Sequence, residues 1–99
     1  GEACCPVFIT MTMPVNNQSY TAPVPFEVGV HATGHTIVRV EIWANTGTGF
    51  VKLGNATGGP IYLYSWTPSA ATGAQVFARV IYDTTKQKDS VIALIGVTF

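Results

Sequence analysis

The chain has 99 residues, a length typical of one domain, so we expect a single domain over residues 1–99 with residues 1–6 as a linker or terminal extension. Charged residues make up only 10% of it and the formal net charge is zero. The five basic residues are scattered, which argues against a nucleic-acid partner, and no apolar run is long enough for membrane insertion.

Strand signals dominate the chain, because six prolines and ten glycines punctuate segments rich in β-branched and aromatic residues. The predicted strands are Val7–Met13, Phe26–Ala32, Ile37–Ala44, Phe50–Leu53, Ile61–Thr67, Gln75–Tyr82 and Ser90–Phe99. Seven short strands separated by turns predict an all-β fold, a two-sheet antiparallel sandwich, with a closed barrel as the alternative.

Alternation assigns faces to two of these strands. In the second strand, Phe26, Val28, Val30 and Ala32 are expected to point inward. In the third strand, the inward set is Val38, Val40 and Ile42, and the outward set is Arg39, Glu41 and Trp43.

Three segments resemble the bacterial Ig-like domains. "ITMTMPVNNQSYTAP" is similar to the family's opening strand and its two spaced prolines, and "IVRVEIWANTG" resembles its "I-x-x-V-E-F-Y-A-N-G" strand. "LGNATGGPIYLYSWTPSAATGAQVFARVIYD" follows the pattern that leads to the family's "A-x-D". The resemblance runs from about Phe8 onward and implies a seven-stranded antiparallel immunoglobulin-like β-sandwich.

The family also implies a role. Such domains recur as spacer or accessory modules in secreted or cell-surface bacterial proteins that degrade polysaccharide or mediate adhesion. The resemblance therefore implies a non-catalytic module whose partners are flanking domains of the same polypeptide. A carbohydrate-binding module, with polysaccharide as partner, is the first alternative.

Aromatic residues at alternate positions mark the fifth predicted strand, where "YLYSWTP" carries Tyr62, Tyr64 and Trp66. Such a row either stacks on sugar rings or fills a sandwich core. We expect Tyr64 and Trp66 in the core, and place Tyr62 at the margin of a ligand-binding surface.

Trp43 is the main binding candidate, because it shares the expected wet face with Arg39 and Glu41. An indole on a solvent face can anchor a sugar or a protein partner, or can simply shield the sheet by stacking on the stem of Arg39. Arg39, Glu41, Trp43 and Tyr62 are therefore the candidate ligand-binding residues.

Cys4 and Cys5 are the only cysteines. A bridge between neighbours, a bridge to another chain or flanking domain, and free thiols all remain open. His31 and His35 have no Cys, Asp or Glu close by in the sequence, so we expect no metal site and no cofactor.

No nucleophile motif is present, and catalysis is not expected. Glu27 and Glu41 lie on consecutive predicted strands, and neighbouring strands would allow them to approach each other as a glycosidase pair does. A flat sandwich face, however, offers no deep cleft between them.

The last predicted strand, "SVIALIGVTF", is apolar at almost every position. One of its faces must be covered within the domain or must form a contact surface, and an edge position would invite pairing with another chain. Weak self-association or protein interaction through this strand is the second alternative function.

Overall fold

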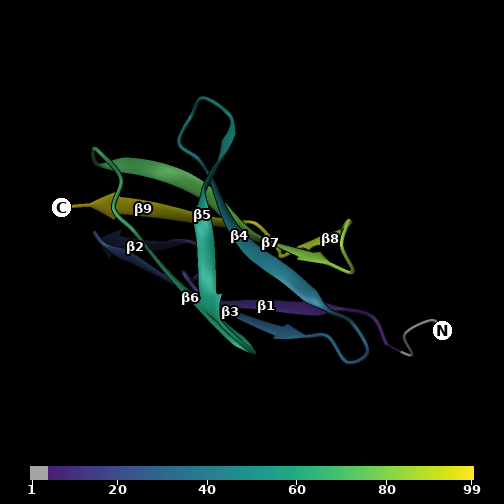
Figure 1. The fold of residues 1–99 in the computed structure, drawn as a ribbon. Helices are drawn as coiled ribbons and strands as arrows, with labels where there is room; N and C mark the ends of the chain where they lie inside the picture. The colour runs from purple at the N-terminus through teal and green to yellow at the C-terminus, as the bar shows by residue number, and fades with distance from the viewer. Residues whose placement is uncertain (1–4) are drawn as a thin grey trace.

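Nine strands and no helix make up the computed structural model, which describes residues 5–99 (Figure 1). The strands are β1 (Phe8–Met13), β2 (Gln18–Thr21), β3 (Val24–His31), β4 (Ile37–Asn45), β5 (Phe50–Gly58), β6 (Ile61–Trp66), β7 (Thr72–Tyr82), β8 (Lys86–Asp89) and β9 (Ala93–Thr98). Within the described residues there is accordingly no helix that could cross a membrane. The predicted extension over residues 1–6 falls largely outside the described part.

The strands pack as two layers. One layer contains β1, β3 and β6, and the other contains β4, β7, β8, β9 and β2. Strand β5 links the layers, because it pairs with β4 along most of its length and with β6 at Thr57 and Gly58. The path of paired strands ends at β1 and β2 without closing on itself. The sandwich prediction is confirmed, and the barrel alternative is wrong.

The strand count differs from the predicted seven for local reasons. Residues 15–19 were expected to form a loop, yet Gln18 and Ser19 belong to β2, which pairs in parallel with β9, the one parallel pairing among the described strands. The lysine-rich segment expected to be a turn instead forms β8, which pairs antiparallel with β7. Strand β5 extends to Gly58 rather than ending at Leu53. Each of these segments is polar, so hydrophobic alternation could not mark it as a strand.

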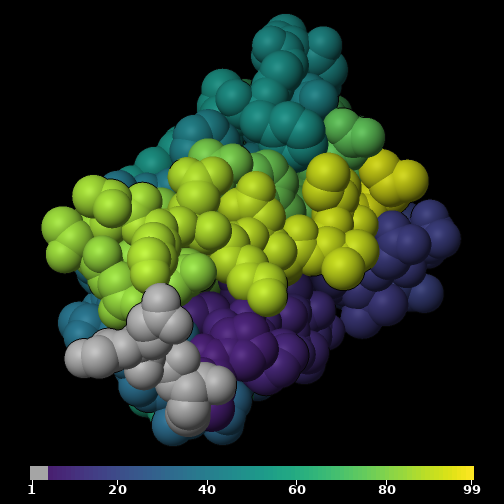
Figure 2. All heavy atoms as spheres, turned by 90° about the vertical axis from the view of Figure 1, so that its right-hand side faces the viewer, coloured from purple at the N-terminus to yellow at the C-terminus, as the bar shows by residue number. Residues whose placement is uncertain are grey.

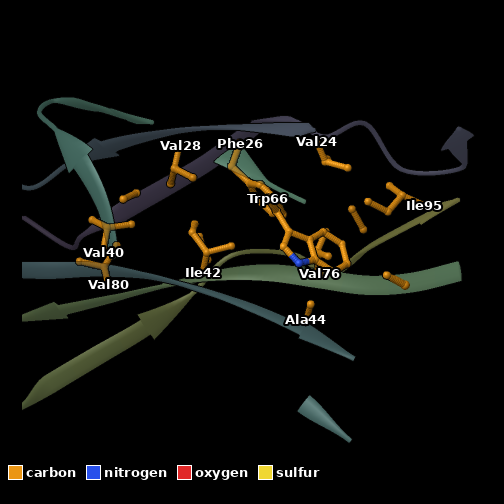
Figure 3. Close-up of a cluster of buried hydrophobic side chains, with 14 of the residues drawn as sticks. Val24, Phe26, Val28, Val40, Ile42, Ala44, Trp66, Val76, Val80 and Ile95 are labelled. Atoms are coloured by element: carbon orange, nitrogen blue, oxygen red, sulfur yellow. The ribbon is translucent and has the colours of Figure 1, made fainter. Parts of the chain in front are cut away.

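The core lies between the layers (Figure 3). From β3 it takes Phe26, Val28 and Val30 as predicted, while Ala32 is only half-buried beyond the end of that strand. Trp66 is 8% exposed and projects into this core, so its predicted structural role is confirmed. Tyr64 packs its ring against the edge of Phe26 and is partly buried.

One expectation for β4 is wrong. Val38 was expected to point inward, but it is 47% exposed, whereas Val40 and Ile42 are buried as predicted. The pairing of β4 with β7 shifts by one residue between Ile37 and Arg39, and such a bulge changes the face onto which a side chain projects.

The last strand begins at Ala93 rather than Ser90, and it lies inside its layer between β7 and β2. Its Ala93, Ile95 and Val97 are buried, and Leu94 stays 46% exposed. Because both edges of β9 are paired, pairing with another chain through its backbone is not open to it. Among the described strands, β1, β2 and β8 each pair with a single neighbour and so have an unpaired edge.

Candidate functional site

A cluster of rings and charges covers the outer face of the β4–β5–β7 layer. It consists of Arg39, Glu41, Trp43, Phe50, Lys52, Phe77, Arg79 and Asp89, and we call it the Trp43 cluster. The antiparallel register sets Trp43 beside Phe77 on β7 and beside Lys52 on β5, and sets Glu41 beside Arg79. Directly paired residues project from the same face, so strands distant in sequence build one surface.

Glu41 is the centre of this cluster. Its carboxylate accepts hydrogen bonds from Arg39 Nε at 2.6 Å and from the Trp43 indole Nε1 at 3.0 Å, and Lys52 Nζ lies 3.5 Å away. The residue is only 5% exposed, although it was expected on a fully wet face. The rings and aliphatic stems of its neighbours therefore cover it.

Burial by itself would raise the pKa of Glu41, because it disfavours the charged form. The hydrogen bonds from Arg39 and Trp43, together with the charge of Lys52, outweigh burial and hold the pKa of Glu41 below its ordinary value. Glu41 is thus a fixed carboxylate anion rather than a proton donor at neutral pH.

The aromatic rings of the Trp43 cluster contact one another in a row. Trp43 and Phe77 lie nearly parallel, with centroids 6.2 Å apart and planes 7° apart, and Phe50 meets Phe77 edge-on at 5.2 Å. The Arg79 guanidinium carbon lies 4.9 Å from the Trp43 ring centroid and 5.3 Å from that of Phe77. Asp89 holds that guanidinium through two hydrogen bonds and raises the pKa of Arg79.

The structure brings together three of the four sequence-predicted ligand-binding residues, Arg39, Glu41 and Trp43. Tyr62 does not join them, because it lies on β6 in the other layer and packs partly buried against the core. Sequence reasoning missed Phe77 and Arg79. They alternate with the inward Val76, Ala78 and Val80, so the period of β7 marked them as outward but could not show that Trp43 lies beside them.

Glu27 and Glu41 do not approach each other. Strands β3 and β4 lie in different layers, and both carboxylates belong to outward positions, so the core separates them. The suggested approach of these two residues on neighbouring strands is wrong, because consecutive strands of a sandwich can belong to opposite sheets.

The hollows of the surface are shallow and poor in ionisable groups. One of about 310 Å³ runs between β1 and residues 91–93, where Figure 2 shows β1 (purple) beside the β8–β9 segment (lime to yellow). A second, of about 390 Å³, lies between the β4–β5 turn and Leu94, and neither is lined by an acidic or basic side chain. A hollow of about 260 Å³ over Gly29 has His31 as its one titratable lining residue.

The cysteine and histidine expectations have separate outcomes. Cys5 is disulfide-bonded, which excludes a free thiol at this position, and Cys4 lies outside the described residues. Within residues 5–99 no three His, Cys, Asp or Glu side chains gather as metal ligands would. His35 instead contacts Asp83, whose side chain also accepts a hydrogen bond from the Thr36 backbone N–H in the β3–β4 loop.

Two open-edged sheets packed face to face, with a strand that links them, define an immunoglobulin-like module. A scan against known families matches residues 8–78 to the bacterial Ig domain, and the chain belongs to that family. The match covers the first two segments on which the sequence resemblance depended and the third as far as Ala78, and it ends within β7.

Solved structures with the same fold include the fibronectin(III)-like modules of CbhA from Clostridium thermocellum, at 16% identity and a TM-score of 0.69, covering 92% of this chain and 96% of that one. An endo-β-1,4-mannanase from Thermotoga petrophila matches at 13% identity and a TM-score of 0.70 over 98% of this chain. An engineered protein matches at 15% identity and a TM-score of 0.67 over 95% of this chain. The chain spans only 21% of the mannanase and 20% of the engineered protein. The search of curated proteins found no match.

Proposed function

We propose that this chain is a non-catalytic spacer or accessory module of a larger secreted or cell-surface bacterial protein that acts on polysaccharide or adheres to a surface. Membership of the bacterial Ig domain family supports this role. So does the fold match to about a fifth of a mannanase chain, since a module of this kind is one part of that longer polypeptide.

The observation that carries the non-catalytic assignment is the state of the acidic side chains. Among the described residues these are Glu27, Glu41, Asp83 and Asp89. Glu41 is bonded to Arg39 and Trp43, Asp83 to His35 and Thr36, and Asp89 to Arg79. Glu27 lies on the opposite outer face from Glu41. A glycoside hydrolase typically needs two carboxyl groups that face each other across a cleft, and the described acidic residues include no such pair.

The shape of the module suits a spacer. Its principal extents are 48 × 22 × 20 Å, and the described start of the chain and Phe99 lie toward opposite ends of the long axis (Figure 1). A module that the chain enters at one end and leaves at the other separates its neighbours by its own length. The dense core between the layers makes that separation rigid.

A second candidate function is glycan binding at the Trp43 cluster. It is favoured by the contact of Trp43 and the exposed Phe50 with Phe77, which is itself only 6% exposed, on one outer face with Arg39 and Lys52 at its margin. Flat rings stack on the apolar faces of sugars, and charged donors can bond their hydroxyls. Because Arg79 covers part of the Trp43 ring, a sugar would contact the exposed Phe50 side of the cluster first.

One set of assays separates the two functions. Purified chain is mixed with insoluble cellulose, xylan, mannan and chitin, and bound protein and released reducing ends are measured. The spacer assignment predicts neither binding nor release. Release of reducing ends would overturn it. Retention that Trp43→Ala abolishes, and that Leu63→Ala on the opposite outer face leaves intact, would replace it with the glycan-binding function.

A further inference from the structure

The imidazole of His35 lies between two oxygen atoms. Its Nδ1 is 2.6 Å from Asp83 Oδ2, and its Nε2 is 2.6 Å from the backbone carbonyl oxygen of Cys5. The side chain is 10% exposed, so water has little access to either contact. Three distant parts of the chain thereby meet at one ring: the segment before β1, the β3–β4 loop and the β7–β8 turn.

The two partners have the same hydrogen-bonding character. A carbonyl oxygen can only accept, and so can an ionised carboxylate. A neutral imidazole has one N–H and can satisfy one of them, whereas an imidazolium has two and can satisfy both. The observed geometry is therefore complete only when His35 is protonated.

The groups facing His35 favour that state. The hydrogen bond to Asp83 is the main cause that raises the pKa of His35, and the bond to the Cys5 carbonyl adds to it. Burial and the charge of Lys86 act in the opposite direction but are outweighed. Tyr82 meets the ring edge-on at 5.1 Å, and Asp83 is itself fixed by the Thr36 amide at 2.9 Å.

Loss of one proton from the His35 imidazolium affects its contacts with Asp83 and with the Cys5 carbonyl differently. The remaining N–H stays on Nδ1, because the charged carboxylate is the stronger acceptor. Nε2 then presents its lone pair to the Cys5 carbonyl oxygen, and two acceptors at this distance repel each other. The contact with Cys5 is the one that breaks.

The contact between His35 and the Cys5 carbonyl holds the segment that precedes β1. Val7 is 2% exposed and anchors the start of the domain, while Cys5 lies two residues before it and is disulfide-bonded. Release of the Cys5 carbonyl leaves Val7 in place and removes the hydrogen bond that joins the Cys5 backbone to the ring of His35.

We propose that His35 is a proton-operated clasp, in which the imidazolium ties the backbone of Cys5 to Asp83 and loss of one proton releases the Cys5 end of the chain. This clasp concerns contacts within the module and does not rest on the proposed spacer function. If another module precedes this one, the clasp makes the stiffness of the joint depend on pH.

Nuclear magnetic resonance of the ¹³C- and ¹⁵N-labelled chain tests the clasp without any substitution. The His35 ring nitrogens and the Cys5 carbonyl carbon are followed through a pH titration. We expect both signals to move together, with a midpoint above the ordinary histidine value of 6.5. A Cys5 carbonyl signal that stays constant while His35 titrates would overturn the proposal.

Two variants sharpen the result. Asp83→Asn removes the charge that favours the imidazolium, so the shared midpoint should move to lower pH. His31→Gln is the matched control, because His31 is an exposed residue of β3 that contacts the Thr33 hydroxyl, and it should leave the midpoint unchanged. A midpoint that Asp83→Asn does not shift contradicts the clasp. If that variant does not fold, the titration of the unsubstituted chain still decides.

Discussion

The indole N–H of Trp43 donates a hydrogen bond to Oε1 of Glu41 at 3.0 Å, and this bond joins the aromatic and the charged residues of the Trp43 cluster. It gives the indole N–H an acceptor within the protein, and it fixes the ring against Phe77. It also makes one of the three hydrogen-bonding or ionic contacts that keep a nearly buried carboxylate charged. The Trp43 cluster is therefore held together internally before any ligand is considered.

Replacing Glu41 tests that cohesion. Glu41→Leu leaves the indole N–H without its acceptor and places Arg39 and Lys52 beside an apolar group, so the free energy of unfolding should fall by about 1–3 kcal/mol. Glu41→Gln keeps an acceptor for the Trp43 indole N–H and should lower the free energy of unfolding by less. Urea unfolding measures both. Glu27→Leu, on the opposite outer face, is the control and should stay within about 0.5 kcal/mol of the parent chain. Equal losses for Glu27→Leu and Glu41→Leu would contradict the role of Glu41.

A glycine beside Tyr64 gives a second prediction. A Cβ at Gly54 would lie 2.8 Å from both Cε1 and Oη of Tyr64, whose hydroxyl donates to the Leu53 carbonyl at 2.9 Å. Gly54→Ala must displace that ring, and overpacking of this kind costs about 1–3 kcal/mol. Thermal unfolding should show a lower midpoint for Gly54→Ala. Gly73→Ala, where the nearest atom is 3.9 Å away, is the matched control, and an equal effect there would contradict the steric explanation.

The fold was predictable from sequence wherever a strand has one wet and one dry face. Alternation identified Phe26, Val28 and Val30 correctly, because β3 is regular over its inward positions. It failed at Val38, where the pairing of β4 with β7 shifts. A bulge of that kind leaves no mark in the hydrophobic pattern of its own strand.

The candidate site was predictable only along a single strand. Arg39, Glu41 and Trp43 alternate on β4, so their common face could be inferred. Phe77 and Arg79 reach the same surface through the register between β4 and β7, which pairs residues more than thirty positions apart in the sequence. The burial of Glu41 was not predictable either, because it depends on those same neighbours.

Trp66 provides a prediction for the core. It projects between the layers and is 8% exposed, so Trp66→Ala should lower the free energy of unfolding by about 3–5 kcal/mol. Leu63 on the same strand is 57% exposed, and Leu63→Ala should change the free energy by about 0.5 kcal/mol or less. Chemical denaturation of the two variants compares the faces of β6 directly. A larger loss for Leu63→Ala would mean that the outer face of β6 is covered.

The His35–Asp83 pair predicts how stability depends on pH. The pKa of His35 is raised by its hydrogen bond to Asp83. Its contribution to the free energy of unfolding is therefore complete below the ordinary pKa of 6.5 and disappears as pH rises through the higher pKa of the folded chain. The pKa of Asp83 is lowered by its hydrogen bond to His35, so its contribution is present above the ordinary value of 3.8 and disappears on acidification. Their joint contribution should be greatest between 3.8 and 6.5.

Urea unfolding across this range, compared between the parent chain and His35→Gln, measures that contribution. The difference in free energy of unfolding should be larger at about pH 5.5 than at about pH 9, because the stabilisation by the His35 imidazolium is lost as pH rises through its raised pKa. His31→Gln should follow the parent chain at both values. A difference that grows toward alkaline pH would reverse the expected sign and show that neutral His35, rather than its imidazolium, stabilises the folded chain.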